Sequence, residues 1–118
     1  MYEIKVTDEF CGAHILRGYK GECEELHGHN WKVEVAVRGG ALDKNGMLMD
    51  FKDLKGALRN VLAGLDHKYL NGLSYFKKKN PTSENIARFI HERLSAAVKK
   101  KIKISVWETA SSCASFEK

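Results

Sequence analysis

Three histidines are the residues of this sequence whose type and spacing point most directly to chemistry. His27 and His29 lie two positions apart, and Gly28 between them lets a ligand or another backbone approach closely. In an extended segment, residues two apart face the same side, so both imidazoles can share a metal ion. His14 lies in an earlier extended segment, on the same parity as Phe10, and offers a third ring.

A site of three histidines with no fourth protein ligand is typical of catalytic zinc, because one coordination position stays open for water or substrate. The sequence therefore predicts that His14, His27 and His29 hold one Zn2+ per chain. A three-histidine site does not by itself distinguish zinc from iron or manganese. The same spacing also suits a hydrogen-bonded histidine pair, with His14 an ordinary strand residue.

The cysteines differ in their relation to these histidines. Cys23 stands four residues before His27 in a loop rich in Gly and Glu, where a neighbouring metal ion and histidine would favour the thiolate that a base or nucleophile requires. An unreactive loop cysteine and a further zinc ligand are the alternatives. Cys11 is one residue off the parity of His14 and is expected to pack on the other face; Cys113 is also assigned to packing. Three cysteines without disulfide spacing indicate a reducing compartment.

Two acidic positions could complete a site. Asp66 and His67 are adjacent at the end of a predicted helix, where such a pair can relay protons, although surface Asp–His pairs without function are common. Glu108 continues the parity of Ile104 and Val106 on the predicted core face, where an unpaired carboxylate is unfavourable. A bound heterocycle with two adjacent N–H groups would satisfy Glu108, and a salt bridge to a Lys or Arg is the alternative.

Two stretches of alternating apolar residues predict the strands that position the histidines. The first covers residues 2–16, where the polar pair Thr7–Asp8 allows an interruption. The second runs from His29 to Arg38 and ends at Gly39–Gly40, before a turn over residues 43–46. The two strands are predicted to pair antiparallel, which would bring His14 towards the other two histidines.

Apolar residues at three- and four-residue spacing predict two helices. Asp50 caps the first, whose apolar face extends to Leu65. The second begins at Thr82–Ser83 after Pro81 and is expected to end in the Lys99–Lys101 run. Strands over 102–107 and 113–116 follow. This order predicts an α+β fold, a four-stranded antiparallel sheet with two helices packed on one face.

Length and composition predict one domain over residues 1–118, because 43% of the 118 residues are hydrophobic and 30% are charged. The sequence lacks a signal peptide and any apolar run of the ~18 to 20 residues that a membrane span needs, so we expect a soluble, cytoplasmic protein without a membrane partner. A net charge of +5 favours anionic ligands such as phosphorylated metabolites. The runs 77–79 and 99–103 are rich in Lys but lack interleaved aromatic residues, so no nucleic-acid partner is expected.

Six short motifs stand in order along the chain: FCGAHIL at 10–16, CEELHGHNW at 23–31, MDF at 49–51, LDHKYLN at 65–71, NPTSEN at 80–85 and VWET at 106–109. Together they resemble the 6-pyruvoyltetrahydropterin synthase family from end to end. The three residues between Cys23 and His27 resemble the 6-carboxytetrahydropterin synthase branch of queuosine and deazapurine biosynthesis. Pyruvoyl-forming members typically have a longer gap.

The resemblance assigns a role to each candidate residue by position. It implies zinc ligands His14, His27 and His29, a general base Cys23, a relay His67 beside Asp66, a pterin-anchoring Glu108, and substrate contacts by Thr82 and Ser83 in the fifth motif. Gly12 and Ile15 depart from the family's commoner residues, which leaves the ligand set intact but puts the shape of the pocket in doubt. The family's tunnelling fold also implies a homo-oligomer, a trimeric barrel or a hexamer of two barrels, with active sites between subunits.

The implied reaction converts 7,8-dihydroneopterin triphosphate to 6-carboxy-5,6,7,8-tetrahydropterin, with loss of acetaldehyde and triphosphate. Two alternatives stay open at this point. The first is a sibling enzyme of the same fold that forms 6-pyruvoyltetrahydropterin or cleaves the side chain of a dihydroneopterin. The second is a zinc-stabilised RNA-binding module without catalysis, which the three-ligand site disfavours because structural zinc usually has four protein ligands.

Overall fold

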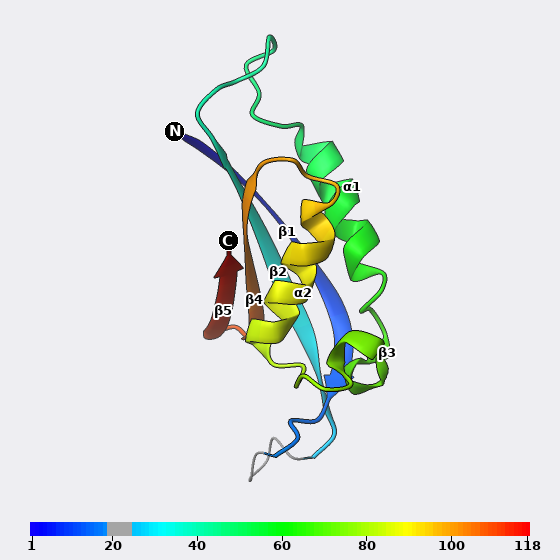
Figure 1. The fold of residues 1–118 in the computed structure, drawn as a ribbon. Helices are drawn as coiled ribbons and strands as arrows, with labels where there is room; N and C mark the ends of the chain where they lie inside the picture. The colour runs from blue at the N-terminus through cyan, green and yellow to red at the C-terminus, as the bar shows by residue number, and fades with distance from the viewer. Residues whose placement is uncertain (19–24) are drawn as a thin grey trace.

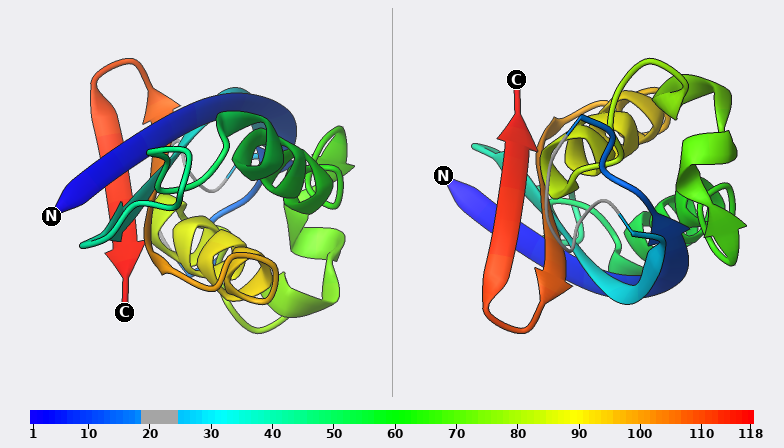
Figure 2. Two further views of the ribbon diagram at one scale, coloured as in Figure 1. Left: turned by 90° about the horizontal axis from the view of Figure 1, so that it is seen from above. Right: turned by 90° about the horizontal axis from the view of Figure 1, so that it is seen from below.

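A five-stranded sheet covered on one face by two helices forms the body of the protein (Figure 1). The structure is a computed structural model and describes residues 1–18 and 25–118. Its elements in chain order are β1 (Tyr2–His14), β2 (His27–Gly39), α1 (Phe51–Leu62), β3 (Lys68–Tyr69), η2 (Leu70–Gly72), η3 (Ser74–Phe76), α2 (Ser83–Ser95), β4 (Lys101–Thr109) and β5 (Ser112–Glu117). Both helices lie on the same side of the sheet, and its other face is left uncovered by them (Figure 2).

The sheet has the order β3-β1-β2-β4-β5. Its four main strands pair antiparallel, as the sequence predicts, but β3 adds a fifth strand parallel to β1, so the prediction of a purely antiparallel four-stranded sheet is wrong. Strand β3 comprises only two residues, both exposed, and therefore has no alternating apolar pattern from which it could be recognised. A hydrogen bond of 2.6 Å from the His67 N–H to the Cys11 carbonyl leads the chain into this pairing.

Strands β1 and β2 pair without a break from Tyr2 opposite Gly39 to His14 opposite His27. The predicted antiparallel pairing is confirmed, whereas the interruption allowed near Thr7–Asp8 does not occur. The first strand ends at His14, two residues earlier than predicted, and the second begins two residues earlier, at His27. This register places His14 directly across from the His27–His29 pair.

The helices begin where their caps predict. The Asp50 carboxylate accepts a hydrogen bond of 2.8 Å from the Lys52 N–H, and the Thr82 hydroxyl accepts one of 3.1 Å from the Asn85 N–H. Both helices end earlier than their apolar patterns suggest. Helix α1 stops at Leu62, and α2 stops at Ser95 because the chain turns back on the Leu94 carbonyl and Lys101 already belongs to β4.

The core lies between the inner face of the sheet and the two helices. Trp31, which is fully buried, stacks on Phe10 with ring centroids 5.9 Å apart, and its indole N–H donates to the Gly12 carbonyl at 3.3 Å. The other inward residues include Val33, Val35 and Val37 of β2, Leu54, Leu58 and Leu62 of α1, and Ile86, Ile90 and Leu94 of α2. Each large apolar side chain contributes roughly 1.5 to 3 kcal/mol by leaving water. This packed layer fixes the strand ends that carry the histidines.

Across the ranges 1–18 and 25–118, no helix has both the length and the apolar character required to cross a membrane.

Candidate metal centre and relay pair

Three histidines and one glutamate converge at the end of the sheet where β1 ends and β2 begins. His14, His27, His29 and Glu108 each present a donor atom within 4.8 Å of the other three. The Nε2 atoms of His14 and His27 are 2.9 Å apart. Oε1 of Glu108 lies 2.8 Å from Nε2 of His29, 3.5 Å from that of His14 and 4.0 Å from that of His27. The donor atoms are therefore close enough together to bind one metal ion.

Backbone carbonyls fix the tautomers of two of these rings. Nδ1–H of His14 donates to the Pro81 carbonyl at 2.8 Å, and Nδ1–H of His27 donates to the Glu25 carbonyl at 2.7 Å. With neutral rings, both Nε2 atoms then carry lone pairs and face each other at 2.9 Å. Two lone pairs that close repel unless a cation or a proton lies beside them. A carbonyl on the remote nitrogen is the usual outer support of a metal-binding histidine.

The state of His14 and His29 agrees with metal binding. Burial lowers the pKa of His14, so that the neutral ring, which is the form that binds metals, predominates. Nε2 of His29 is buried and lies 2.8 Å from Oε1 of Glu108, without the geometry of a hydrogen bond. A carboxylate oxygen and an imidazole nitrogen this close require a proton or a cation between them, which a metal ion could supply. The donor set of imidazoles and one carboxylate suits a zinc-class ion.

Glu108 reaches this cluster from β4. Lys32 of β2 pairs with Trp107, so the next residue, Glu108, projects to the histidine side of the sheet. The side chain retains 32% of its exposure, and within the described chain its charged neighbours are the three histidines, in place of the Lys or Arg that a simple salt bridge would use. The prediction that Glu108 needs a donor-rich partner agrees with this position, but its closeness to the three histidines was not predicted.

Asp66 and His67 form a separate pair at the start of β3. The Asp66 carboxylate accepts a hydrogen bond of 2.9 Å from the Cys11 N–H and lies 3.0 Å from Nδ1 of His67. The Cys11 N–H first, and the His67 ring second, lower the pKa of Asp66. His67 has a left-handed backbone with φ of 57°, which is uncommon for residues other than glycine. Such a conformation is found where the surrounding structure imposes it, often at functional sites.

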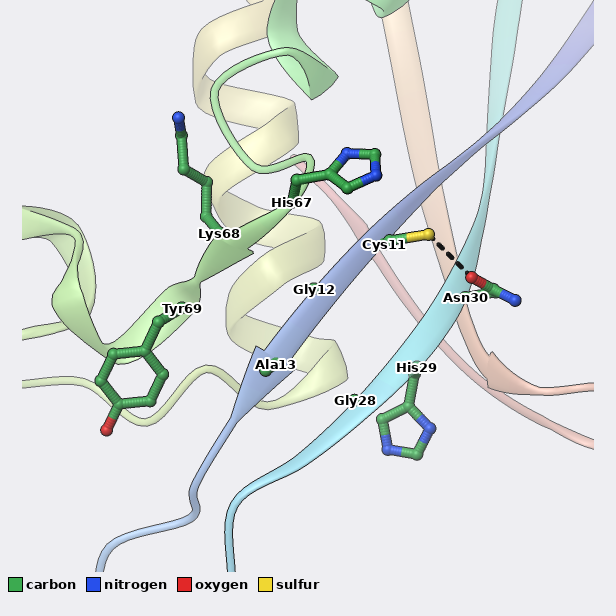
Figure 3. A pocket seen from close by; sticks show the side chains of 9 residues that line it. All are labelled: Cys11, Gly12, Ala13, Gly28, His29, Asn30, His67, Lys68 and Tyr69. Carbon is green, nitrogen blue, oxygen red and sulfur yellow. Dashed lines mark hydrogen bonds between the residues drawn. The ribbon is translucent and has the colours of Figure 1, made fainter.

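An open cavity lies beside the Asp66–His67 pair, along β1 and the start of β2. It has a volume of about 530 Å³ and is lined by nine residues, shown in Figure 3: Cys11, Gly12, Ala13, Gly28, His29, Asn30, His67, Lys68 and Tyr69. His29 and His67 thus border the same space, from β2 and from the entry to β3. A Cβ atom at Gly28 would meet nothing nearer than 3.7 Å, so the close approach predicted there is not needed within the chain.

Known proteins share both the sequence pattern and the fold of this chain. The sequence profile of the 6-pyruvoyl tetrahydropterin synthase family matches residues 3–118. The chain belongs to this family. The solved structure of the Caenorhabditis elegans 6-pyruvoyl tetrahydropterin synthase superimposes with a TM-score of 0.89 at 27% identity, covering 99% of this chain and 95% of that one.

Similar proteins carry the names of more than one activity. The chain is 42% identical over 92 residues to a putative 6-carboxy-5,6,7,8-tetrahydropterin synthase of Archaeoglobus fulgidus, covering 78% of this chain and 75% of that protein. It is 31% identical over 140 residues to the Haemophilus influenzae 6-carboxy-5,6,7,8-tetrahydropterin synthase, covering 99% of both. It is also 42% identical over 102 residues to the dihydroneopterin monophosphate aldolase of Pyrococcus furiosus, covering 84% and 82%.

The remaining predicted site residues of this family member differ in where they lie. Cys23 lies outside the described residues, so its role as general base stays a prediction. The Thr82 hydroxyl caps α2, and Ser83 is the first residue of that helix. Thr82 directly follows Pro81, whose carbonyl accepts a hydrogen bond from His14. Substrate binding by Thr82 and Ser83 therefore stays a prediction too.

The structure corrects the assignment of two cysteines to packing. Cys11 and Cys113 are both exposed. Cys11 does face away from His14, as its parity predicts, but that face of the sheet is uncovered, so its thiol donates to the Asn30 side-chain oxygen at 2.8 Å. The sequence contained no signal for the meeting of Cys11 with Asp66, because these residues are 55 positions apart and join through a strand too short to recognise.

Proposed function

We propose that this chain is a zinc-dependent lyase that converts 7,8-dihydroneopterin triphosphate to 6-carboxy-5,6,7,8-tetrahydropterin, with release of acetaldehyde and triphosphate, as a step of queuosine and deazapurine biosynthesis. The observation that carries the proposal is the pair of carbonyl-fixed histidines, His14 and His27, whose Nε2 atoms face each other at 2.9 Å. The end-to-end similarity to the Haemophilus influenzae enzyme supports this particular product.

Zinc would be held by His14, His27 and His29. When bound, it supplies Lewis acidity that polarises oxygen atoms of the substrate side chain. Three protein ligands leave a coordination position for those oxygens. The buried Nε2 of His29, beside the Glu108 carboxylate, and the neutral state of His14 both favour this ligand set.

Two groups of the chain would move protons. We assign the first transfer to the Cys23 thiolate, four residues before His27, and the second to His67. Asp66 lies 3.0 Å from Nδ1 of His67 and is itself held by the Cys11 N–H, so it can orient the ring and stabilise its protonated form. The shared cavity that His29 and His67 border supports a role for both on one substrate.

Glu108 would orient the pterin ring. A carboxylate can accept two parallel hydrogen bonds from adjacent N–H groups of a heterocycle, which sets both position and direction. The partial exposure of Glu108 leaves it open to such a ligand. Replacing Glu108 with Gln should raise KM and lower kcat/KM by about 10- to 100-fold, because one hydrogen bond to a charged acceptor, roughly 1.5 to 3 kcal/mol, is lost. Unchanged KM in that variant would contradict the assignment.

The proposed active assembly is a homo-oligomer, a trimer or a hexamer, with its sites between subunits. The uncovered face of the sheet and the terminal strands β3 and β5, which have no further strand beside them in the described chain, favour such an arrangement, since open sheet edges invite pairing. The net charge of +5 suits a triphosphate substrate.

A sibling activity is the second candidate. The 42% identity to the Pyrococcus furiosus dihydroneopterin monophosphate aldolase, equal to that of the Archaeoglobus fulgidus relative, favours cleavage of the side chain of a monophosphate substrate. The same metal ligands and relay could serve either reaction, so the products discriminate between them.

The test is to incubate the zinc-loaded protein with 7,8-dihydroneopterin triphosphate and, separately, with 7,8-dihydroneopterin monophosphate, and to identify products by chromatography and mass. We expect carboxytetrahydropterin and acetaldehyde from the triphosphate, and their loss in Cys23→Ala. A hydroxymethyl product from the monophosphate would move the function to the aldolase, and a pyruvoyl product to the pyruvoyl-forming enzymes. Absence of turnover with metal bound, together with salt-dependent RNA affinity, would favour the binding module.

A further inference from the structure

We propose that Cys11, Asp66 and His67 form a second metal site, distinct from the histidine cluster, that binds a thiophilic divalent cation such as Zn2+. A thiolate, a carboxylate and an imidazole each offer one donor atom here, and these atoms all lie within 4.8 Å of one another. Cys11 and His14 stand on opposite faces of β1, three residues apart, so the two sites use different faces of the sheet.

The donor types favour zinc over harder cations. Zinc binds thiolate, imidazole and carboxylate in tetrahedral sites, at roughly 2.0 to 2.3 Å, whereas magnesium and calcium bind oxygen ligands. Tetrahedral ligands at such distances are about 3.3 to 3.8 Å apart, so the most widely separated of the three donors must approach by up to about 1.5 Å. His67 can supply this movement, because its side chain retains 79% of its exposure.

The surroundings hold the site ready without blocking it. The Cys11 N–H fixes the Asp66 carboxylate at 2.9 Å, and the Asp66 carboxylate in turn lies 3.0 Å from the His67 ring. The Asn30 side-chain amide, 2.8 Å from the Cys11 sulfur, can turn to donate an N–H to a thiolate, which is the outer support expected of a ligated cysteine. Lys68, which lines the same cavity, extends away from the cysteine (Figure 3).

Cobalt titration of the metal-stripped full-length chain tests the site directly. The background is Cys23→Ser, so that Cys23 cannot contribute a thiolate. We expect two equivalents of Co2+ per chain and a near-ultraviolet sulfur-to-cobalt charge-transfer band, since the histidine cluster contains no sulfur. Adding Cys11→Ser should abolish the band and leave one equivalent. Adding Cys113→Ser, which removes an exposed cysteine of β5 instead, should change neither.

His67→Asn provides an independent variant, because Asn tolerates the left-handed backbone but lacks the imidazole. It should likewise lose the second equivalent. A single equivalent in the Cys23→Ser protein, or a charge-transfer band that survives Cys11→Ser, would overturn the proposal. Both Cys11→Ser and His67→Asn replace exposed side chains, so each is expected to fold.

Inhibition by excess metal is a consequence that rests on the proposed function. Metal bound at His67 would occupy a ring nitrogen that the proposed mechanism uses for proton transfer. Turnover should therefore fall with zinc above one equivalent, and fall less in Cys11→Ser. Stoichiometry and spectrum report on binding alone, so a protein that binds two metals but shows no turnover even at one equivalent of zinc would count against the proposed function and leave the second site standing.

Discussion

Asn71 should stabilise both the fold and the metal centre, because it clamps the backbone immediately after His14. This residue of η2 is 6% exposed, and its side-chain oxygen accepts from the Ile15 N–H while its amide donates to the Ile15 carbonyl, both at 2.9 Å. Each such bond contributes roughly 0.5 to 1.5 kcal/mol. Asn71→Ala removes both and leaves the Ile15 groups unpaired, so we expect a loss of about 1 to 3 kcal/mol in the free energy of unfolding.

Urea unfolding of the metal-free protein at fixed protein concentration measures this change as a lower midpoint with an unaltered slope. Asn71→Asp should lose at least as much, because a carboxylate oxygen would face the Ile15 carbonyl. Asn60→Ala is the matched control, since Asn60 is exposed on α1, and it should stay within about 0.5 kcal/mol of wild type. Displacement of His14 should also weaken metal binding by about 10- to 100-fold. The reasoning is refuted if Asn71→Ala unfolds at the wild-type midpoint.

Three further predictions concern stability and local order. Burial lowers the pKa of His91 in the folded protein from its ordinary 6.5. Between the lowered pKa and 6.5 the unfolded chain therefore binds more protons than the folded one. The stability that neutral His91 provides is complete above pH 6.5 and is lost as the pH falls towards the lowered pKa. The unfolding free energy of His91→Gln should therefore depend less on pH than that of wild type, and parallel pH profiles would contradict this. Leu54→Ala, at a fully buried position of α1, should lose about 2 to 5 kcal/mol in urea unfolding, and a loss below 1 kcal/mol would show that the site collapses without a cavity. The Arg17 guanidinium donates to backbone carbonyls in the segment 76–79, so Arg17→Ala should speed amide exchange there and not in α1; equal acceleration in both would indicate global destabilisation instead.

The strands and helices that could be predicted are those in which burial of one face imposes a regular spacing of apolar residues. Trp31, Val33, Val35 and Val37 alternate because one face of β2 packs on the helices, so the strand and its pairing could be inferred. Strand β3 follows from the course of the chain after α1, not from its own two residues. Helix α2 stops at Ser95 although apolar residues continue to Val98, because the turn into β4 uses Val98 as a core residue.

The approach of His14 to His27 could be predicted for the same reason, since antiparallel pairing of two recognisable strands brings these residues opposite each other. The approach of Glu108 could not, because it depends on the register of β4 against β2 and on the course of the chain between them. The meeting of Cys11 with Asp66 depends on the connection between α1 and β3, for which the sequence carries no periodic signal. Contacts that depend on the register between segments far apart in the chain could therefore not be predicted.

Zinc content and turnover, measured on the same samples, test the central claim most directly. The Cys11→Ser protein isolates the histidine cluster, and we predict that it binds one zinc per chain and forms carboxytetrahydropterin from 7,8-dihydroneopterin triphosphate. Adding His27→Gln, which removes one of the two facing Nε2 atoms, should abolish both the bound zinc and the product. A His27→Gln protein that keeps its zinc and its turnover would contradict the account.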